Sequence, residues 1–148
     1  MAEQVQVAVK SRSRFGGQED VLTFRGGGTL EKTAQGWRLR YEASNEADGS
    51  PIVSDVTLET ATHRAVVVNE SGSSGYGLLL DPKTPTATRI DGGDGGALTL
   101  NVVTQEVAWQ LSRRGQGFIT LAYTLLLGAQ PLSALRVELT LTKEENRT

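Results

Sequence analysis

The chain has 148 residues, with 15 basic and 17 acidic side chains and a formal net charge of −2. This length suits a single domain, and the near-neutral charge excludes a global field that would attract nucleic acid or an acidic membrane surface. Because the chain has no cysteine, disulfides, thiolate metal sites and cysteine nucleophiles are excluded as well.

Apolar residues alternate with polar residues along most of the chain, which is the pattern of half-buried strands. In chain order, strands are predicted at residues 5–14, 21–33, 37–43, 53–58, 64–70, 76–80, 86–90, 98–103, 106–111, 118–127 and 135–142. The strand at residues 64–70 is predicted from Val66 and Val68, and residues 44–51 are predicted to form a polar surface loop.

Two features of these segments favour a barrel. Gly26, Gly27 and Gly28 interrupt the second segment, and the loss of Cβ atoms there permits the sharp bend by which a sheet turns a barrel corner. The last two segments form a hairpin with strands of about 35 Å, longer than typical strands. With short turns and no helical period, the sequence predicts an all-β antiparallel meander, closed or nearly closed into a barrel of about 8–10 strands. We expect one barrel domain over residues 1–142 and a polar tail over residues 143–148.

Several stretches together resemble the YwiB-like family of small bacterial β-barrel proteins of the calycin (lipocalin-like) superfamily. These stretches are residues 5–14 followed by Gln18-Glu19-Asp20, the segment Arg38-Leu39-Arg40-Tyr41-Glu42, and residues 96–142. The resemblance implies a barrel and leaves the function open. The chain departs from the family's turn motifs at residues 70–72 and 91–96, so the resemblance carries no site residue over to this chain.

Aromatic and hydroxyl side chains share the apolar parity of their strands, which points inward if the sheet closes. They form part of a packed core or line a cavity for one small ligand, and both interpretations stay open. The candidate ligand-binding residues are Trp37, Tyr41, Trp109, Tyr123, Ser11 and Ser13.

Basic side chains occupy the outward parity of the first and third strands, on neighbouring parts of the predicted sheet. With Phe15, Phe24 and Trp37 close by, they could hold an oligonucleotide by backbone pairing and stacking, although outward charges also simply keep strands soluble. This alternative surface patch comprises Lys10, Arg12, Arg14, Arg38 and Arg40.

Other candidates favour no chemistry. His63 is the only histidine and lies in a predicted turn, without a matching base nearby, so a hydrolase or isomerase that uses it is the least favoured hypothesis. The tract Asp91-Gly92-Gly93-Asp94 could hold calcium but lacks the spacing of known calcium loops, so we interpret it as a solvated, mobile hairpin loop. Glu42, Glu106 and Glu138 all fall on the outer parity, which does not support glycosidase-like chemistry. We therefore predict no catalytic residues, no metal and no cofactor.

The sequence as a whole predicts a non-enzymatic barrel that binds a small, largely apolar ligand in its interior. The alternative is an interaction module whose outer basic face binds an acidic protein or single-stranded nucleic acid, of which the net charge disfavours nucleic acid. The N-terminus lacks a signal-peptide pattern and no apolar run reaches membrane-spanning length. We expect a cytoplasmic protein without a membrane partner, and the sequence leaves its oligomeric state open.

Overall fold

The alternating segments pair into one sheet in the computed structural model, which describes residues 2–71, 74–92 and 96–143. Within these ranges ten strands lie in the order β6-β5-β4-β3-β2-β1-β10-β9-β8-β7, and every pairing is antiparallel. The all-β meander is confirmed. The strands are β1 (Ala2–Phe15), β2 (Gln18–Lys32), β3 (Gly36–Asn45), β4 (Pro51–Glu59), β5 (Arg64–Ser71), β6 (Ser74–Leu80), β7 (Thr86–Gly92), β8 (Gly96–Leu111), β9 (Gly117–Leu127) and β10 (Gln130–Lys143).

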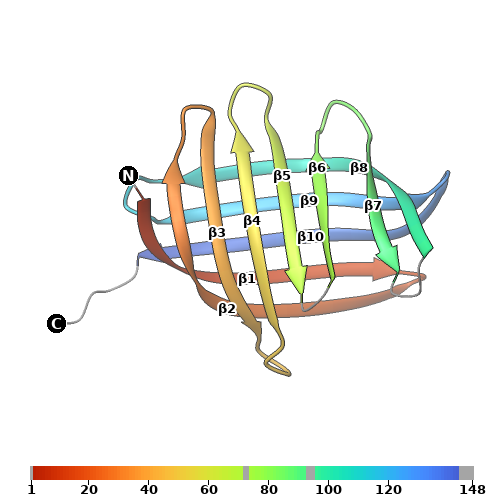
Figure 1. The fold of residues 1–148 in the computed structure, drawn as a ribbon, viewed down its shortest axis with the longest axis horizontal. Helices are drawn as coiled ribbons and strands as arrows, with labels where there is room; N and C mark the ends of the chain where they lie inside the picture. Colours follow the sequence, from red (N-terminus) through yellow and green to blue (C-terminus); the bar gives the residue numbers. More distant parts are fainter. Residues whose placement is uncertain (1, 72–73, 93–95, 144–148) are drawn as a thin grey trace.

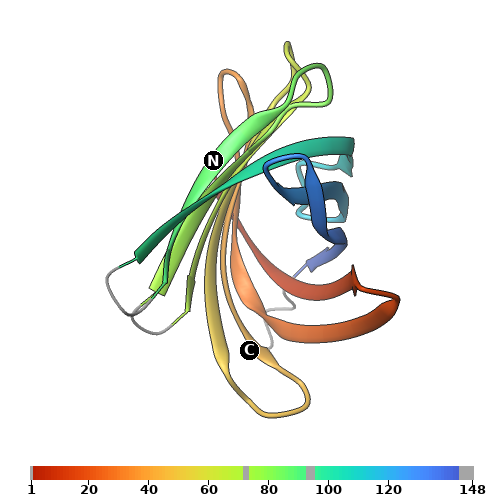
Figure 2. The ribbon, with the colours of Figure 1, turned by 90° about the vertical axis from the view of Figure 1, so that its right-hand side faces the viewer.

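The sheet curls into a nearly closed barrel because the first strand also pairs with the last. β1 contacts β2 on one side and β10 on the other, over residues 5–14 of β1. Figure 1 shows the result as two crossing layers, with β3 to β7 in one and β1, β8, β9 and β10 in the other. Figure 2, viewed from the right-hand side of Figure 1, shows the sheet curving round between these layers.

The three glycines of β2 pair with residues 5–7 of β1 on one side and with residues 41–43 of β3 on the other. A Cβ atom on Gly28 would lie 2.1 Å from the backbone oxygen of Arg40, and one on Gly26 would lie 1.9 Å from that of Glu42. Gly27 faces the other way, and its Cβ would only touch the Val5 oxygen at 3.4 Å. Gly26 and Gly28 therefore let β2 approach β3 more closely than any side chain permits, as the predicted barrel corner requires.

β6 and β7 are the two edges of the sheet, and side chains join them in place of a backbone ladder. Thr86 Oγ1 donates to the Leu79 carbonyl oxygen at 2.5 Å, and Thr88 Oγ1 donates to the Gly77 carbonyl oxygen at 2.5 Å. Unpaired edge carbonyls favour association with other chains. The two threonines cover these carbonyls and close the wall of the barrel.

Thr88→Val tests this seam between the edges. The substitution keeps the shape of a buried side chain (6% exposed) but leaves the Gly77 carbonyl without its donor. Because Gly77 is an exposed residue and water can reach it, the loss should match the net contribution of one hydrogen bond, so the free energy of unfolding in urea should fall by about 0.5–1.5 kcal/mol. Thr99→Val, at an exposed position of β8, is the matched control. Equal unfolding midpoints for the two variants would contradict a role for the hydroxyl.

The inward parity agrees with the sequence pattern in most strands, and the exceptions have physical causes. In β5 the buried valine is Val67, whereas Val66 and Val68, the valines that marked this strand, are 36% and 42% exposed. In β4, Val53 also faces outward and Ser54 is buried. β8 is one continuous strand, and a bulge between Thr104 and Glu106 switches the parity. That bulge merges the two segments predicted at residues 98–103 and 106–111.

The last strand runs to Lys143, one residue beyond the predicted end of the barrel at residue 142. The rest of the predicted tail, and residues 93–95 of the glycine–aspartate tract, lie outside the described residues. Among the described residues, no helix is long and apolar enough to cross a membrane.

Candidate functional site

The meander gives the barrel two chemically different ends. The turns after β2, β4 and β8 lie at one end, which carries Trp37 and Trp109 and which we call the tryptophan end. The turns after β1, β3 and β9 lie at the other end. Ser11 and Ser13, near the end of β1, point inward there, so we call it the serine end. In Figure 1 the tryptophan end lies mainly at the left and top, and the serine end lies mainly at the right and bottom.

Ring contacts and a loop cover the tryptophan end. His63, in the β4–β5 turn, stacks on Trp109 with ring centroids 4.8 Å apart and an interplanar angle of 18°. Lys32 Nζ lies 5.1 Å from the centre of the Trp37 ring. Gly115 of the β8–β9 turn is buried, and a Cβ on it would lie 2.8 Å from Val5 Cγ1. These contacts cover the two tryptophans and Val5, and a pocket of about 420 Å³ lies beside them between the β2–β3 and β4–β5 turns.

Hydrogen bonds also order the β4–β5 turn that carries His63. Glu59 accepts from Thr62 Oγ1 at 2.7 Å and from Arg64 Nε at 3.0 Å. These two bonds favour the carboxylate form and lower the pKa of Glu59 below its ordinary value. His63 itself has a positive φ of 57° and an exposed side chain. Its ring covers Trp109, which gives this histidine a structural contact.

Solvent reaches inward-facing side chains at the serine end. Ser11 lies directly opposite Leu22 on β2 and Val137 on β10, and Ser13 lies opposite Leu135. All of these side chains share the inward parity of Val5, Val7 and Val9, yet Leu22 is 45% exposed and the others are half-buried. We call Ser11, Ser13, Leu22, Leu135 and Val137 the serine platform. It is an amphipathic inner surface that water can reach.

A buried hydroxyl lies in the same cross-strand row as the platform. The row runs from Ser13 through Leu135 and Tyr123 to Thr104 on β8. Tyr123 is 5% exposed and takes part in an interaction within the fold. Thr104 is 7% exposed, and its Oγ1 has no hydrogen-bond partner among the described residues. Such groups are rare in folded proteins, and a bound molecule is one way to satisfy them.

The opposite layer carries a second polar row, formed by the buried Tyr41 on β3 and Ser54 on β4 and the half-buried Asn69 on β5. Ser54 Oγ donates to Asn69 Oδ1, and Tyr41 and Asn69 take part in further interactions. Tyr41 is 6% exposed. Since these groups have partners inside the barrel, they belong to its packed core.

The six predicted ligand-binding residues all face inward, but the structure does not bring them together. Ser11 and Ser13 belong to the serine platform, Tyr41 and Tyr123 lie in the core, and the two tryptophans lie at the other end. Sequence reasoning missed Leu22, Val137 and Thr104. Thr104 could have been found from the sequence, because the inward parity changes between Val102 and Val107 and such a change requires a bulge nearby. Leu22 and Val137 are identified by the pairing of β1 with β2 and β10.

The predicted basic residues fall into two parts, which lie at different levels of β2. Arg40 lies opposite Thr29, whereas Lys10, the nearest basic residue of β1, lies opposite Thr23. Two of the three aromatic residues join neither part, because Phe24 is buried and Trp37 packs against the core. Phe15 alone of the three is exposed, at 62%.

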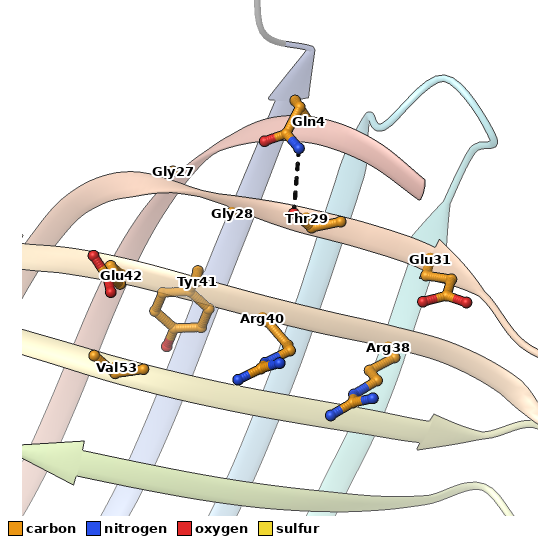
Figure 3. Close-up of a pocket in the computed structure, with 10 residues that line it drawn as sticks. All are labelled: Gln4, Gly27, Gly28, Thr29, Glu31, Arg38, Arg40, Tyr41, Glu42 and Val53. Carbon is orange, nitrogen blue, oxygen red and sulfur yellow. Dashed lines mark hydrogen bonds between the residues drawn. The ribbon is translucent and has the colours of Figure 1, made fainter. Parts of the chain in front are cut away.

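Arg38 and Arg40 line a groove of about 590 Å³ on the outer face, over Gly27 and Gly28 (Figure 3). Arg38 binds Asp55 through two bonds of 2.7 and 3.2 Å, and these bonds raise the pKa of Arg38. Arg40 Nε shares the same carboxylate at 3.5 Å. Glu31 and Glu42 line the groove as well. With its arginines neutralised by carboxylates, this glycine groove is not a cationic surface.

Arg12 and Arg14 line a second outer groove of about 570 Å³, together with an arginine that the sequence analysis did not select, Arg136. Its lining also includes Glu19, Gln105, Ala122, Thr124 and Ala134. We call it the arginine groove. Within the described ranges, no group of three or more histidine, aspartate or glutamate side chains is placed to hold a metal ion.

Comparison with known proteins identifies relatives. Residues 7–139 match the protein family described as "Domain of unknown function (DUF1934)". The crystal structure of the ywiB protein from Bacillus subtilis is similar to this fold with a TM-score of 0.77 and 19% sequence identity, over 97% of this chain and 94% of that chain. No curated protein matches the sequence. The resemblance to the YwiB-like family is thereby confirmed.

Proposed function

The chain belongs to the DUF1934 family, and from that premise we propose that its barrel binds a small, largely apolar molecule with a hydrogen-bonding group at the serine end. The observation that carries the proposal is the serine platform, an inward-facing surface that solvent reaches, in one row with the unpartnered hydroxyl of Thr104. Ligand sites are mostly apolar with a few placed polar groups, and Leu22, Leu135 and Val137 beside Ser11 and Ser13 have that composition.

The tryptophan end holds a pocket of about 420 Å³ between the β2–β3 and β4–β5 turns, but the inside of the barrel is packed in that half. Leu30, Leu39 and Leu58 face inward in that half and are at most 2% exposed. We therefore place the ligand at the serine end alone, bound without chemistry. A meander barrel packed at one end and accessible at the other also supports the calycin-type (lipocalin-like) assignment.

Titration with the neutral probe N-phenyl-1-naphthylamine, whose emission rises in apolar sites, tests the proposal. We expect saturable binding that Val137→Trp weakens by at least about tenfold, or about 1.4 kcal/mol, because the larger ring covers the platform. Thr140→Trp, on the outer face of the same strand, is the matched control. Equal affinity of both variants, or no saturable binding by the parent protein, would refute the proposal.

Thr104→Val should stabilise the free protein and lower its affinity for the N-phenyl-1-naphthylamine probe. The substitution removes a buried hydroxyl that has no partner, so we expect a gain of about 1 kcal/mol in the free energy of unfolding. This is opposite in sign to the expected effect of Thr88→Val, whose hydroxyl is bonded. Urea denaturation measures both variants, and a loss of stability in Thr104→Val would show that the hydroxyl already has a partner.

A further inference from the structure

The arginine groove runs across five strands on the outer face of the barrel. Glu19 comes from β2, Arg12 and Arg14 from β1, Ala134 and Arg136 from β10, Ala122 from β9 and Gln105 from β8. Arg12 lies directly opposite Arg136 in the register of β1 and β10. Because the side chains of Ala122 and Ala134 are small, a groove remains between the long arginine side chains. The fold thus places three guanidinium groups around one shallow, apolar floor.

The groove is lined by three arginines and one carboxylate, Glu19, whereas Glu106 and Glu138 contact Arg136 from outside that lining. Glu19 is shared, at 3.4 Å from Arg14 and 3.9 Å from Arg12, and the second of these is a long contact. Arg136 contacts Glu106 at 3.0 Å and Glu138 at 3.8 Å. Like charges directly opposite each other on paired strands are unfavourable. An anion between Arg12 and Arg136 would relieve their repulsion.

The bulge in β8 brings a neutral polar group to the same place. The register of β8 on β9 shifts between Thr104 and Glu106, so that Gln105 is the extra residue. Its side chain accepts a hydrogen bond from Thr124 Oγ1 at 3.4 Å at the groove wall. Bulges often redirect a side chain next to a functional site. Here the amide adds hydrogen-bonding capacity to a cationic groove.

We propose that the arginine groove binds an acidic, extended segment of another protein, with its carboxylates paired to Arg12 and Arg136. Arginine binds carboxylates through two parallel hydrogen bonds. Five strands span about 19 Å, the length of about six extended residues. Glu19, Glu106 and Glu138 flank the groove and would repel the continuous charge of a nucleic acid backbone, whereas a peptide can space its carboxylates between them. The lining of the groove also includes Ser13 and Leu135 of the serine platform, so the two sites meet at these positions, although the arginines lie on the outward parity and the platform side chains on the inward parity of the same strands.

Fluorescence anisotropy with a labelled oligoglutamate peptide tests the proposal on the full chain. We expect saturable binding at about 0.02 M salt that weakens strongly at about 0.15 M, since salt screens exposed charges. Arg12→Gln and Arg136→Gln should each lower the affinity by about fivefold. Arg40→Gln removes the same charge from the glycine groove and is the matched control, so its affinity should equal that of the parent.

Ala134→Leu provides a second test that retains every arginine. Ala134 is exposed on the floor of the arginine groove, so a leucine there would fill the groove. The affinity for the peptide should fall although the net charge does not change. The proposal is overturned if the peptide does not bind at low salt, if Arg40→Gln weakens it as much as Arg136→Gln, or if Ala134→Leu has no effect. Tighter binding of a labelled oligothymidylate than of the peptide would also overturn it in favour of nucleic acid.

Discussion

Gly28→Ala should destabilise the barrel by at least about 3 kcal/mol, the upper part of the range for overpacking substitutions. The added Cβ would lie 2.1 Å from the Arg40 carbonyl oxygen and 2.7 Å from Tyr41 Cβ. Both neighbours are central in the sheet and fixed by the pairing of β3 with β2 and β4. β2 must therefore move away from β3, which opens the barrel corner. The free energy of unfolding in urea measures this loss.

Gly27→Ala is the matched control for that experiment. Its Cβ would meet only the Val5 oxygen at 3.4 Å, an ordinary contact, and alanine restricts the unfolded chain more than glycine does. The effect should therefore lie within about 1 kcal/mol of zero. If the two alanine variants unfold at the same urea concentration, this result would contradict the close approach of β2 to β3 at Gly28.

Leu78→Ala should lower the free energy of unfolding by about 2–5 kcal/mol, as is usual for buried leucines. Leu78 is 2% exposed although it lies on β6, an edge strand without a backbone ladder to β7. Its burial therefore depends on the seam that Thr86 and Thr88 close. Thermal or urea unfolding monitored by tryptophan fluorescence provides the measurement.

The neighbouring residue offers the control, because Leu79 faces outward and is 37% exposed. Surface substitutions usually change stability by about 0.5 kcal/mol or less, so Leu79→Ala should cost far less than Leu78→Ala. A similar loss in both variants would indicate that β6 is not docked on the barrel and that the seam is open.

The predictability of the site differed between residues for physical reasons. Ser11 and Ser13 were found because a period of two assigns a face to each residue of a regular strand. Thr104 was missed because the bulge at Gln105 changes that parity partway along β8. The inward face of β5 could not be predicted either, because Val66, Val67 and Val68 are all apolar and a run of one residue type has no period. The Trp109–His63 contact joins residues 46 positions apart, from 63 to 109, beyond the reach of local pattern.

By itself, the sequence determined the all-β class, the meander, the barrel corner and the inward side of most strands, since all of these follow from local spacing and from glycine. Only the tertiary structure decided which residues of different strands lie side by side, because this depends on the register of pairing and on the closure of the sheet. Closure separated the tryptophans from the serines, split the basic residues into two grooves and placed Arg136 opposite Arg12. The candidate sites of this barrel arise from that register.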